Sequence, residues 1–167
     1  MATATTKWGD IGDLDVSGVT DFSFAFSKNR NQAGGSFVGN GNPKATTFVG
    51  TAISKWNTVS ATSLDSTFFG ARMMNADLTG WKVGKVKSLK STFRSTYKFT
   101  GTGLSSWDVA KVGTMGGTFF STRSLTTCNK RKIADAWKSS AVFVATTYDT
   151  DWTADTCMVR FEYRATR

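Results

Sequence analysis

The sequence contains no histidine, and proline and glutamate each occur once among its 167 residues, as Pro43 and Glu162. Histidine is the commonest general base and the commonest metal ligand in proteins, so its absence removes the usual centre of acid–base and metal chemistry. The two cysteines, Cys128 and Cys157, lack the histidine partner that activates a thiol nucleophile. We therefore expect a protein that is not an enzyme and that holds no cofactor or metal ion.

Long apolar segments are also absent. No run approaches the about 20 residues that a membrane-spanning helix needs, and the start, MATATTKWGD, has no basic segment followed by an apolar one. This favours a soluble chain from which any signal peptide has already been removed. The formal net charge of +9 favours anionic partners, although it serves solubility equally well. The scarcity of glutamate disfavours long surface helices, whereas 26 threonines and 17 serines favour strands and turns.

One phrase occurs three times in the chain, as WNTVSATSLDSTF from Trp56, WKVGKVKSLKSTF from Trp81 and WDVAKVGTMGGTF from Trp107. Successive tryptophans are separated by 25 and 26 residues, a period typical of stacked repeat units. An earlier copy, which has Leu14 in place of the tryptophan, gives four copies that start at these residues: Ile11, Ile53, Leu78 and Leu104. No copy alone can bury its apolar face, so the copies are predicted to share one core.

Apolar residues recur at the same offset in every copy. The columns are Val19, Ala61, Val86 and Val112; Phe22, Leu64, Leu89 and Met115; Phe26, Phe68, Phe93 and Phe119; and Phe48, Met73, Phe99 and Leu125. Residues between the columns vary among lysine, aspartate, serine and glycine, as expected if they face water. The pattern predicts a mainly β solenoid, leucine-rich-repeat-like (a β-helix in the broad sense), of about four coils of roughly 25 residues.

Two stretches depart from the period. A segment near residues 27–46 is rich in glycine and asparagine and is predicted to be a surface loop, either tolerated or ligand-contacting. After residue 127 the spacing of Ile133 and Trp137 predicts a short closing helix with Thr127 or Asn129 as its N-cap. We therefore expect a single domain, 1–167, with an N-terminal cap (1–10), repeats (11–127) and a C-terminal cap (128–167).

Both cysteines fall in the C-terminal cap, 29 residues apart. A disulfide between Cys128 and Cys157 would stabilise the cap and would indicate an oxidising compartment, hence a secreted or cell-surface protein. A reduced, buried pair in a cytosolic protein is the alternative. In the same region Asp149, Asp151 and Asp155 suggest a calcium loop, but they lack its glycine and glutamate and fit a solvated turn better.

The columns, the WDV..V..M..TF wording and the CNK...AW ending resemble the BspA-like leucine-rich-repeat family of surface proteins, particularly versions from marine unicellular eukaryotes. The resemblance extends from about Ile11 to Cys157. It implies short parallel strands stacked along a right-handed coil, and a role in binding. Where the family often has Met-Phe, this chain has Thr-Phe, for example at Thr92 and Phe93.

Stacked copies would align hydroxyl side chains into rows on the surface, a design that resembles the ice-binding solenoids of other families. Ice binding (antifreeze activity or inhibition of ice recrystallisation) is therefore the first functional prediction. The predicted ice face consists of Thr67, Thr92, Thr118, Ser63, Ser88, Thr114, Ser66 and Ser91. The alternative is that these columns reflect strand propensity and that the threonines, which precede a core phenylalanine, point inward.

A second predicted face is basic and centres on the third copy. Its residues are Lys82, Lys85, Lys87, Lys90 and Arg94. Such a face favours adhesion to an extracellular protein or an anionic glycan. Nucleic acid is not expected, because no aromatic-interleaved platform or recognition helix is recognisable. A structural subunit of a larger assembly is the third possibility, and a monomer is expected otherwise.

Overall fold

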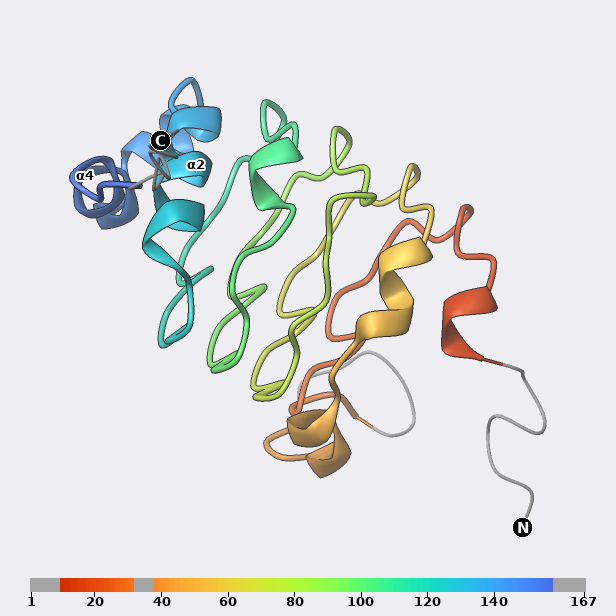
Figure 1. Ribbon diagram of the computed structural model, residues 1–167. Helices are drawn as coiled ribbons and strands as arrows, with labels where there is room; N and C mark the ends of the chain where they lie inside the picture. The colour runs from red at the N-terminus through yellow and green to blue at the C-terminus, as the bar shows by residue number, and fades with distance from the viewer. Residues whose placement is uncertain (1–9, 32–37, 158–167) are drawn as a thin grey trace, which may run out of the picture.

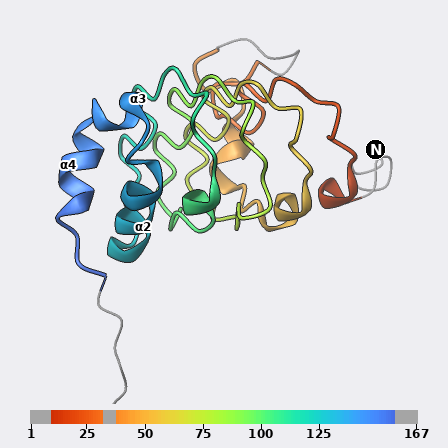
Figure 2. The same ribbon diagram turned by 90° about the horizontal axis from the view of Figure 1, so that it is seen from above.

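The computed structural model describes residues 10–31 and 38–157, and its chain forms a row of similar loops that ends in a group of short helices (Figure 1). Within these described residues, four 3₁₀ helices lie along the row: η1 (Ile11–Asp13), η2 (Pro43–Thr47), η3 (Thr51–Lys55) and η4 (Leu104–Ser106). Three α-helices of the same described residues close it: α2 (Thr127–Trp137), α3 (Ala141–Val144) and α4 (Thr147–Thr153). A view turned by 90° places these α-helices together at one end, away from the N-terminus (Figure 2).

The prediction of a mainly β, leucine-rich-repeat-like solenoid or β-helix is wrong. Within residues 10–31 and 38–157 the β-pairing is limited to isolated parallel bridges between single residues, Asp21 with Ser63, Ser63 with Ser88, and Ser88 with Thr114. Left-handed backbone follows each bridge: φ is +52° at Ser66, +54° at Ser91 and +66° at Gly117. An extended strand cannot pass through that conformation, so turns occupy the places where strands were expected.

The turns nevertheless bond to one another across neighbouring copies. The amides of Leu64, Ser66 and Phe68 donate to carbonyls of the third copy, those of Ser88, Lys90 and Thr92, at 3.1, 2.9 and 3.0 Å. Amides of the intervening residues bond within their own turn, as Thr67 does to the Leu64 carbonyl. Alternate amides therefore link the copies, and the rest close the turns.

A column of tryptophans runs through the core. Trp56, Trp81, Trp107 and Trp137 are stacked with centroid separations of 6.3, 6.5 and 6.4 Å. Each indole N–H donates to a backbone carbonyl of the preceding copy, those of Ile11, Ile53, Leu78 and Leu104, at 2.8–3.2 Å. Because a buried indole needs one acceptor, this bond satisfies the ring and joins adjacent copies.

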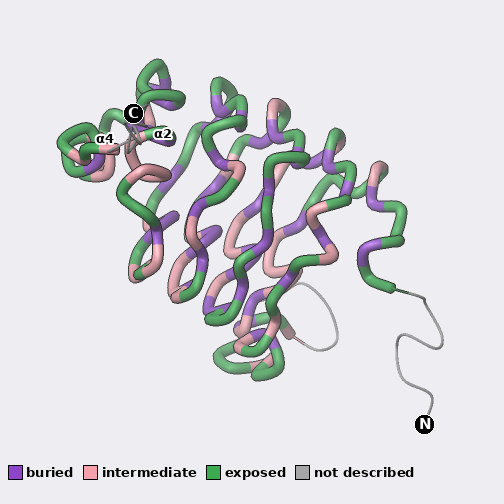
Figure 3. The backbone as a smooth tube through the Cα atoms, in the orientation of Figure 1, coloured by how far each residue is buried: buried purple, intermediate pink, exposed green. Residues whose placement is uncertain are grey.

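A parallel column of phenylalanines lies beside the tryptophans. The centroids of Phe26, Phe68, Phe93 and Phe119 are separated by 5.5, 5.7 and 5.7 Å, with interplanar angles of at most 12°. The predicted phenylalanine column is confirmed. Buried residues accordingly follow the inner sides of the loops (Figure 3).

Other predicted columns need correction. Met74, not Met73, is buried, and Met73 is 44% exposed. In the first copy Leu14 and Val19 are also exposed, since no preceding copy covers them among the described residues.

The inserted segment near residues 27–46 lies along the lower edge of the row (Figure 1). Residues 32–37 lie outside the described part, but the remainder is tied to the first copy. The Val38 amide donates to the Asn29 carbonyl at 2.8 Å, and Phe48 stacks on Phe26 at 4.4 Å. Phe48, just after the segment, packs on Phe26 as Phe99 packs on Phe93 in the third copy, at 4.5 Å.

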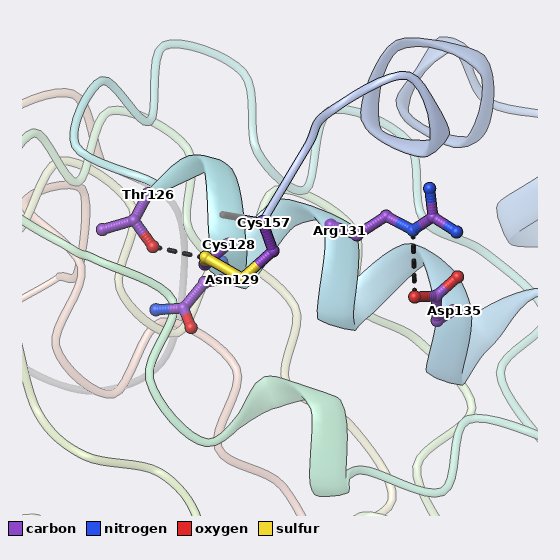
Figure 4. Close-up of a disulfide and its surroundings, with 6 residues drawn as sticks. All are labelled: Thr126, Cys128, Asn129, Arg131, Asp135 and Cys157. Atoms are coloured by element: carbon purple, nitrogen blue, oxygen red, sulfur yellow. Dashed lines mark hydrogen bonds and ion pairs between the residues drawn. A yellow bond between two sulfur atoms is a disulfide. The ribbon is translucent and has the colours of Figure 1, made fainter. Parts of the chain in front are cut away.

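The predicted closing helix is present as α2, but both predicted N-caps, Thr127 and Asn129, lie inside it. Thr126 is its N-cap, since its hydroxyl accepts from the Asn129 amide at 3.1 Å. The disulfide between Cys128 and Cys157 is confirmed and ties the segment after α4 to the start of α2 (Figure 4). Helices α2, α3 and α4 form the helical end of the structure. Because α2 carries Trp137, this end covers the fourth copy with a ring of the tryptophan column.

We predict that Phe93→Ala lowers the free energy of unfolding by about 3–5 kcal/mol, because it removes a fully buried ring with neighbours on both sides. Lys98→Ala, at an exposed position five residues later, should change it by less than about 0.5 kcal/mol. Urea denaturation of the two variants measures the difference. Equal midpoints would contradict the assignment of Phe93 to the core.

Candidate ligand-binding surface

Thr67, Thr92 and Thr118, the threonine row of the predicted ice face, are fully buried. Their hydroxyls donate to carbonyls of the preceding copy, those of Phe22, Leu64 and Leu89, at 3.1, 2.9 and 2.8 Å. The phenylalanine that follows each threonine is buried as well, which the alternation of a strand would forbid. The prediction that these three residues contact ice is therefore wrong, because the left-handed residue before each one turns it inward.

The other predicted hydroxyls form a broken surface. The residues joined by the parallel bridges, Asp21, Ser63, Ser88 and Thr114, form the bridge row. In this row Ser63 and Ser88 are half-buried, and Thr114 is exposed. Ser63 shares a hydrogen bond of 2.8 Å with the Ser23 hydroxyl, and the Ser88 hydroxyl donates to the Asp65 carboxylate. Ser66 and Ser91 are half-buried at the left-handed positions of their turns. Much of this hydroxyl capacity is thus directed at other protein groups.

The predicted basic face is divided among three places. Lys87 and Lys90 are exposed on either side of Ser88 in the bridge row, and Arg94 is half-buried between aromatic rings. Lys82 and Lys85 are exposed and line an open pocket of about 490 Å³. The five residues therefore make no single patch, although all belong to the third copy.

The pocket at Lys82 and Lys85 has a well-fixed rim. The Thr58 hydroxyl accepts from the Lys82 amide at 2.8 Å and donates to the Lys82 carbonyl at 3.1 Å. Thr79, on the rim, donates its hydroxyl and its amide to Asp77, and these bonds lower the pKa of that carboxyl. The rim therefore carries cations, hydroxyls and the Asp108 carboxylate side by side.

Two rows of alternating cations and aromatic rings follow the core phenylalanine column in sequence. The phenylalanine row (Phe69, Arg94 and Phe120) comes one residue after that column, and the tyrosine row (Arg72, Tyr97 and Arg123) comes four residues after it. In the phenylalanine row, the Arg94 guanidinium lies 5.7 Å from the Phe69 ring centroid and 4.6 Å from that of Phe120, and Lys28 lies 5.8 Å from Phe69. In the tyrosine row, Arg72 and Arg123 lie 5.4 and 4.5 Å from the Tyr97 ring. Each distance is typical of a cation–π contact.

Sequence reasoning found only Arg94 among these residues. Phe69, Arg94 and Phe120 occupy one offset of the repeat, and Arg72, Tyr97 and Arg123 occupy another. Both rows become visible in the sequence when the residues at one offset are compared between copies for alternation of a cation with an aromatic ring. A comparison for identical residue types does not detect them.

Few carboxylates neutralise the cations of this surface. The ion pairs among the described residues are Lys55 with Asp13 at 3.9 Å and Arg131 with Asp135 at 2.9 Å. The first lies among the 3₁₀ helices and the second in α2, so neither includes a cation of the two rows. Near Arg94, burial raises the pKa of the Tyr148 phenol, although the Phe119 amide and Arg94 itself act in the opposite direction.

The described part of the chain offers no grouping of three or more histidine, cysteine or acidic side chains suited to a metal ion. Asp149 and Asp151 belong to helix α4, and Asp155 follows it, so these residues do not form a calcium loop. In the same described residues, no helix is long and apolar enough to cross a membrane.

One family model matches the chain, over residues 42–150, which is 109 of the 167 residues. Its description is "Mycoplasma protein of unknown function, DUF285". No curated protein and no solved structure matches the sequence. The family match covers the second to fourth copies and most of the helical end.

We predict that Thr92→Val lowers the free energy of unfolding by about 1–2 kcal/mol, because it removes a buried hydroxyl whose proton is shared between the Leu64 and Leu89 carbonyls. Thr114→Val, at an exposed position in the next copy, should change it by less than about 0.5 kcal/mol. Thermal and urea unfolding compare the two. A Thr92→Val variant as stable as the parent would contradict the bonding role of the threonine row.

Proposed function

We propose, on the premise that the chain belongs to the DUF285 family, that this protein is a non-enzymatic recognition module that binds an anionic ligand outside the cell or at its surface. The family description assigns no activity. The proposal therefore depends on the character of the surface.

The observation that carries the proposal is the number of exposed cations without a carboxylate partner. Lys87 and Lys90 lie beside the bridge row, Lys82 and Lys85 lie at the pocket, and none of the four forms an ion pair within the described residues. The chain as a whole carries a formal charge of +9. Unpaired exposed cations raise the local concentration of anions and speed their association.

Two features support a location outside the cytosol. The Cys128–Cys157 disulfide is typical of oxidising compartments. The repeat also resembles the BspA-like surface proteins, and that resemblance favours adhesion over catalysis. A glycan or protein that carries negative charge is the ligand class that fits both features.

Ice binding stays a prediction, but no observation now favours it over an anionic ligand. Thr67, Thr92 and Thr118 are buried, and charged side chains at Asp65 and Lys90 interrupt the half-buried serines. Thermal hysteresis at micromolar protein is the direct measurement of that activity.

We predict that the protein is retained on immobilised dextran sulfate at low salt and is released as salt is raised, because screening weakens exposed charge pairs. Lys87→Glu combined with Lys90→Glu should weaken binding about tenfold, which corresponds to about 1.4 kcal/mol. The charge-matched control, Lys132→Glu with Lys138→Glu, changes two exposed lysines of the helical end and should weaken binding less than about threefold.

Two results would count against this proposal. If the parent passes through dextran sulfate and neutral dextran alike, the surface is not a polyanion-binding site. If both double variants lose the same affinity, net charge rather than this surface determines retention.

A further inference from the structure

The phenylalanine row and the tyrosine row differ from scattered surface charge, because three consecutive copies build them together. Arg94 of the third copy lies between Phe69 of the second and Phe120 of the fourth. Tyr97 of the third copy lies in turn between Arg72 and Arg123. Cation and ring thus alternate along both rows, and the order is opposite in the two.

We propose that these rows form a binding site for the sulfate or carboxylate groups of an extended acidic polysaccharide, with Arg72, Arg94 and Arg123 as the anion-contacting residues. The inference rests on the proposed function, because it names the ligand class and the part of the surface that selects it.

The three guanidinium groups lie over ring faces, 4.5 to 5.7 Å from the centroids. A guanidinium has several N–H donors, and two of them match two oxygens of one carboxylate or sulfate. In the described part of the chain, the guanidinium groups of Arg72, Arg94 and Arg123 donate to no protein acceptor and pair with no carboxylate. The ring contacts therefore use none of these N–H donors, which remain available to a ligand.

The same geometry argues against single-stranded nucleic acid. Proteins that hold single strands stack bases on free aromatic faces. Arg72 and Arg123 come from the copies before and after Tyr97 and both lie over its ring, and Lys28 and Arg94 both lie over the ring of Phe69. Phe120, which is 54% exposed, is the ring of the two rows with the most free surface. The site thus offers donors for oxyanions and little platform for bases.

The ligand is an extended chain because the cations recur from copy to copy. Lys28 in the first copy, Arg72 in the second, Arg94 in the third and Arg123 in the fourth lie in or beside the same two offsets. Neighbouring copies are held in register by the aromatic columns, so the cations follow the long axis of the stack. A linear polyanion engages several of them at once and gains affinity from each added contact.

The test keeps charge constant and changes only geometry. Arg72→Lys combined with Arg123→Lys retains both charges but loses planar, bidentate contacts, and Tyr97→Leu retains every charge but removes the shared ring. Dextran sulfate, hyaluronan, single-stranded poly(dT) and neutral dextran serve as probes, with Arg131→Lys in helix α2 as the matched control. Urea unfolding of each variant verifies that it is folded.

We expect the double Arg→Lys variant to bind dextran sulfate about tenfold more weakly than the parent, and Tyr97→Leu about fivefold more weakly. Arg131→Lys should stay within about twofold, and the parent should bind poly(dT) more weakly than dextran sulfate.

If the parent binds dextran sulfate but folded double Arg→Lys protein binds equally well, the rows are not the site, although the proposed function stands. Tighter binding of poly(dT) would overturn the ligand class, and a parent that binds no polyanion would overturn the proposed function itself.

Discussion

The contact between equivalent aromatic rings of successive copies is the interaction on which the rest of this structure depends. Each copy lacks enough apolar surface to fold alone, and its tryptophan and phenylalanine are covered only when the next copy supplies the same rings. The indole hydrogen bond to the preceding copy adds direction to this contact, because a ring rotated away from the carbonyl would leave a buried donor unsatisfied. Stacking therefore sets both the spacing and the register of everything on the surface.

A turn-based backbone decides which side chains reach that surface. In a strand, neighbouring residues alternate between core and solvent, but here Thr92 and Phe93 are both buried. The left-handed residue before each threonine turns it towards the preceding copy, where its hydroxyl bonds to the backbone. The threonines consequently stabilise contacts between copies, and Arg72 and Arg123 of the tyrosine row stay exposed.

The sequence predicted contacts between residues of the same kind better than it predicted backbone conformation. The column of Phe68, Phe93 and Phe119 and the Cys128–Cys157 disulfide follow from recurrence and count, and both are present. Strands were predicted wrongly because threonine and aromatic residues favour strands, and serine at φ near +54° carries no sequence mark of its own. The tyrosine row was missed because its arginines and its ring change identity between copies, although they keep one offset.

A double-mutant cycle on neighbouring tryptophans tests the central claim most directly. If the rings stack as described, Trp81→Leu and Trp107→Leu are coupled by about 1 kcal/mol in urea unfolding, whereas Trp81→Leu and Phe143→Leu, whose rings share no contact, are additive within about 0.5 kcal/mol. Additive effects for the Trp81 and Trp107 pair, equal to those of the distant pair, would contradict an aromatic column that joins the copies.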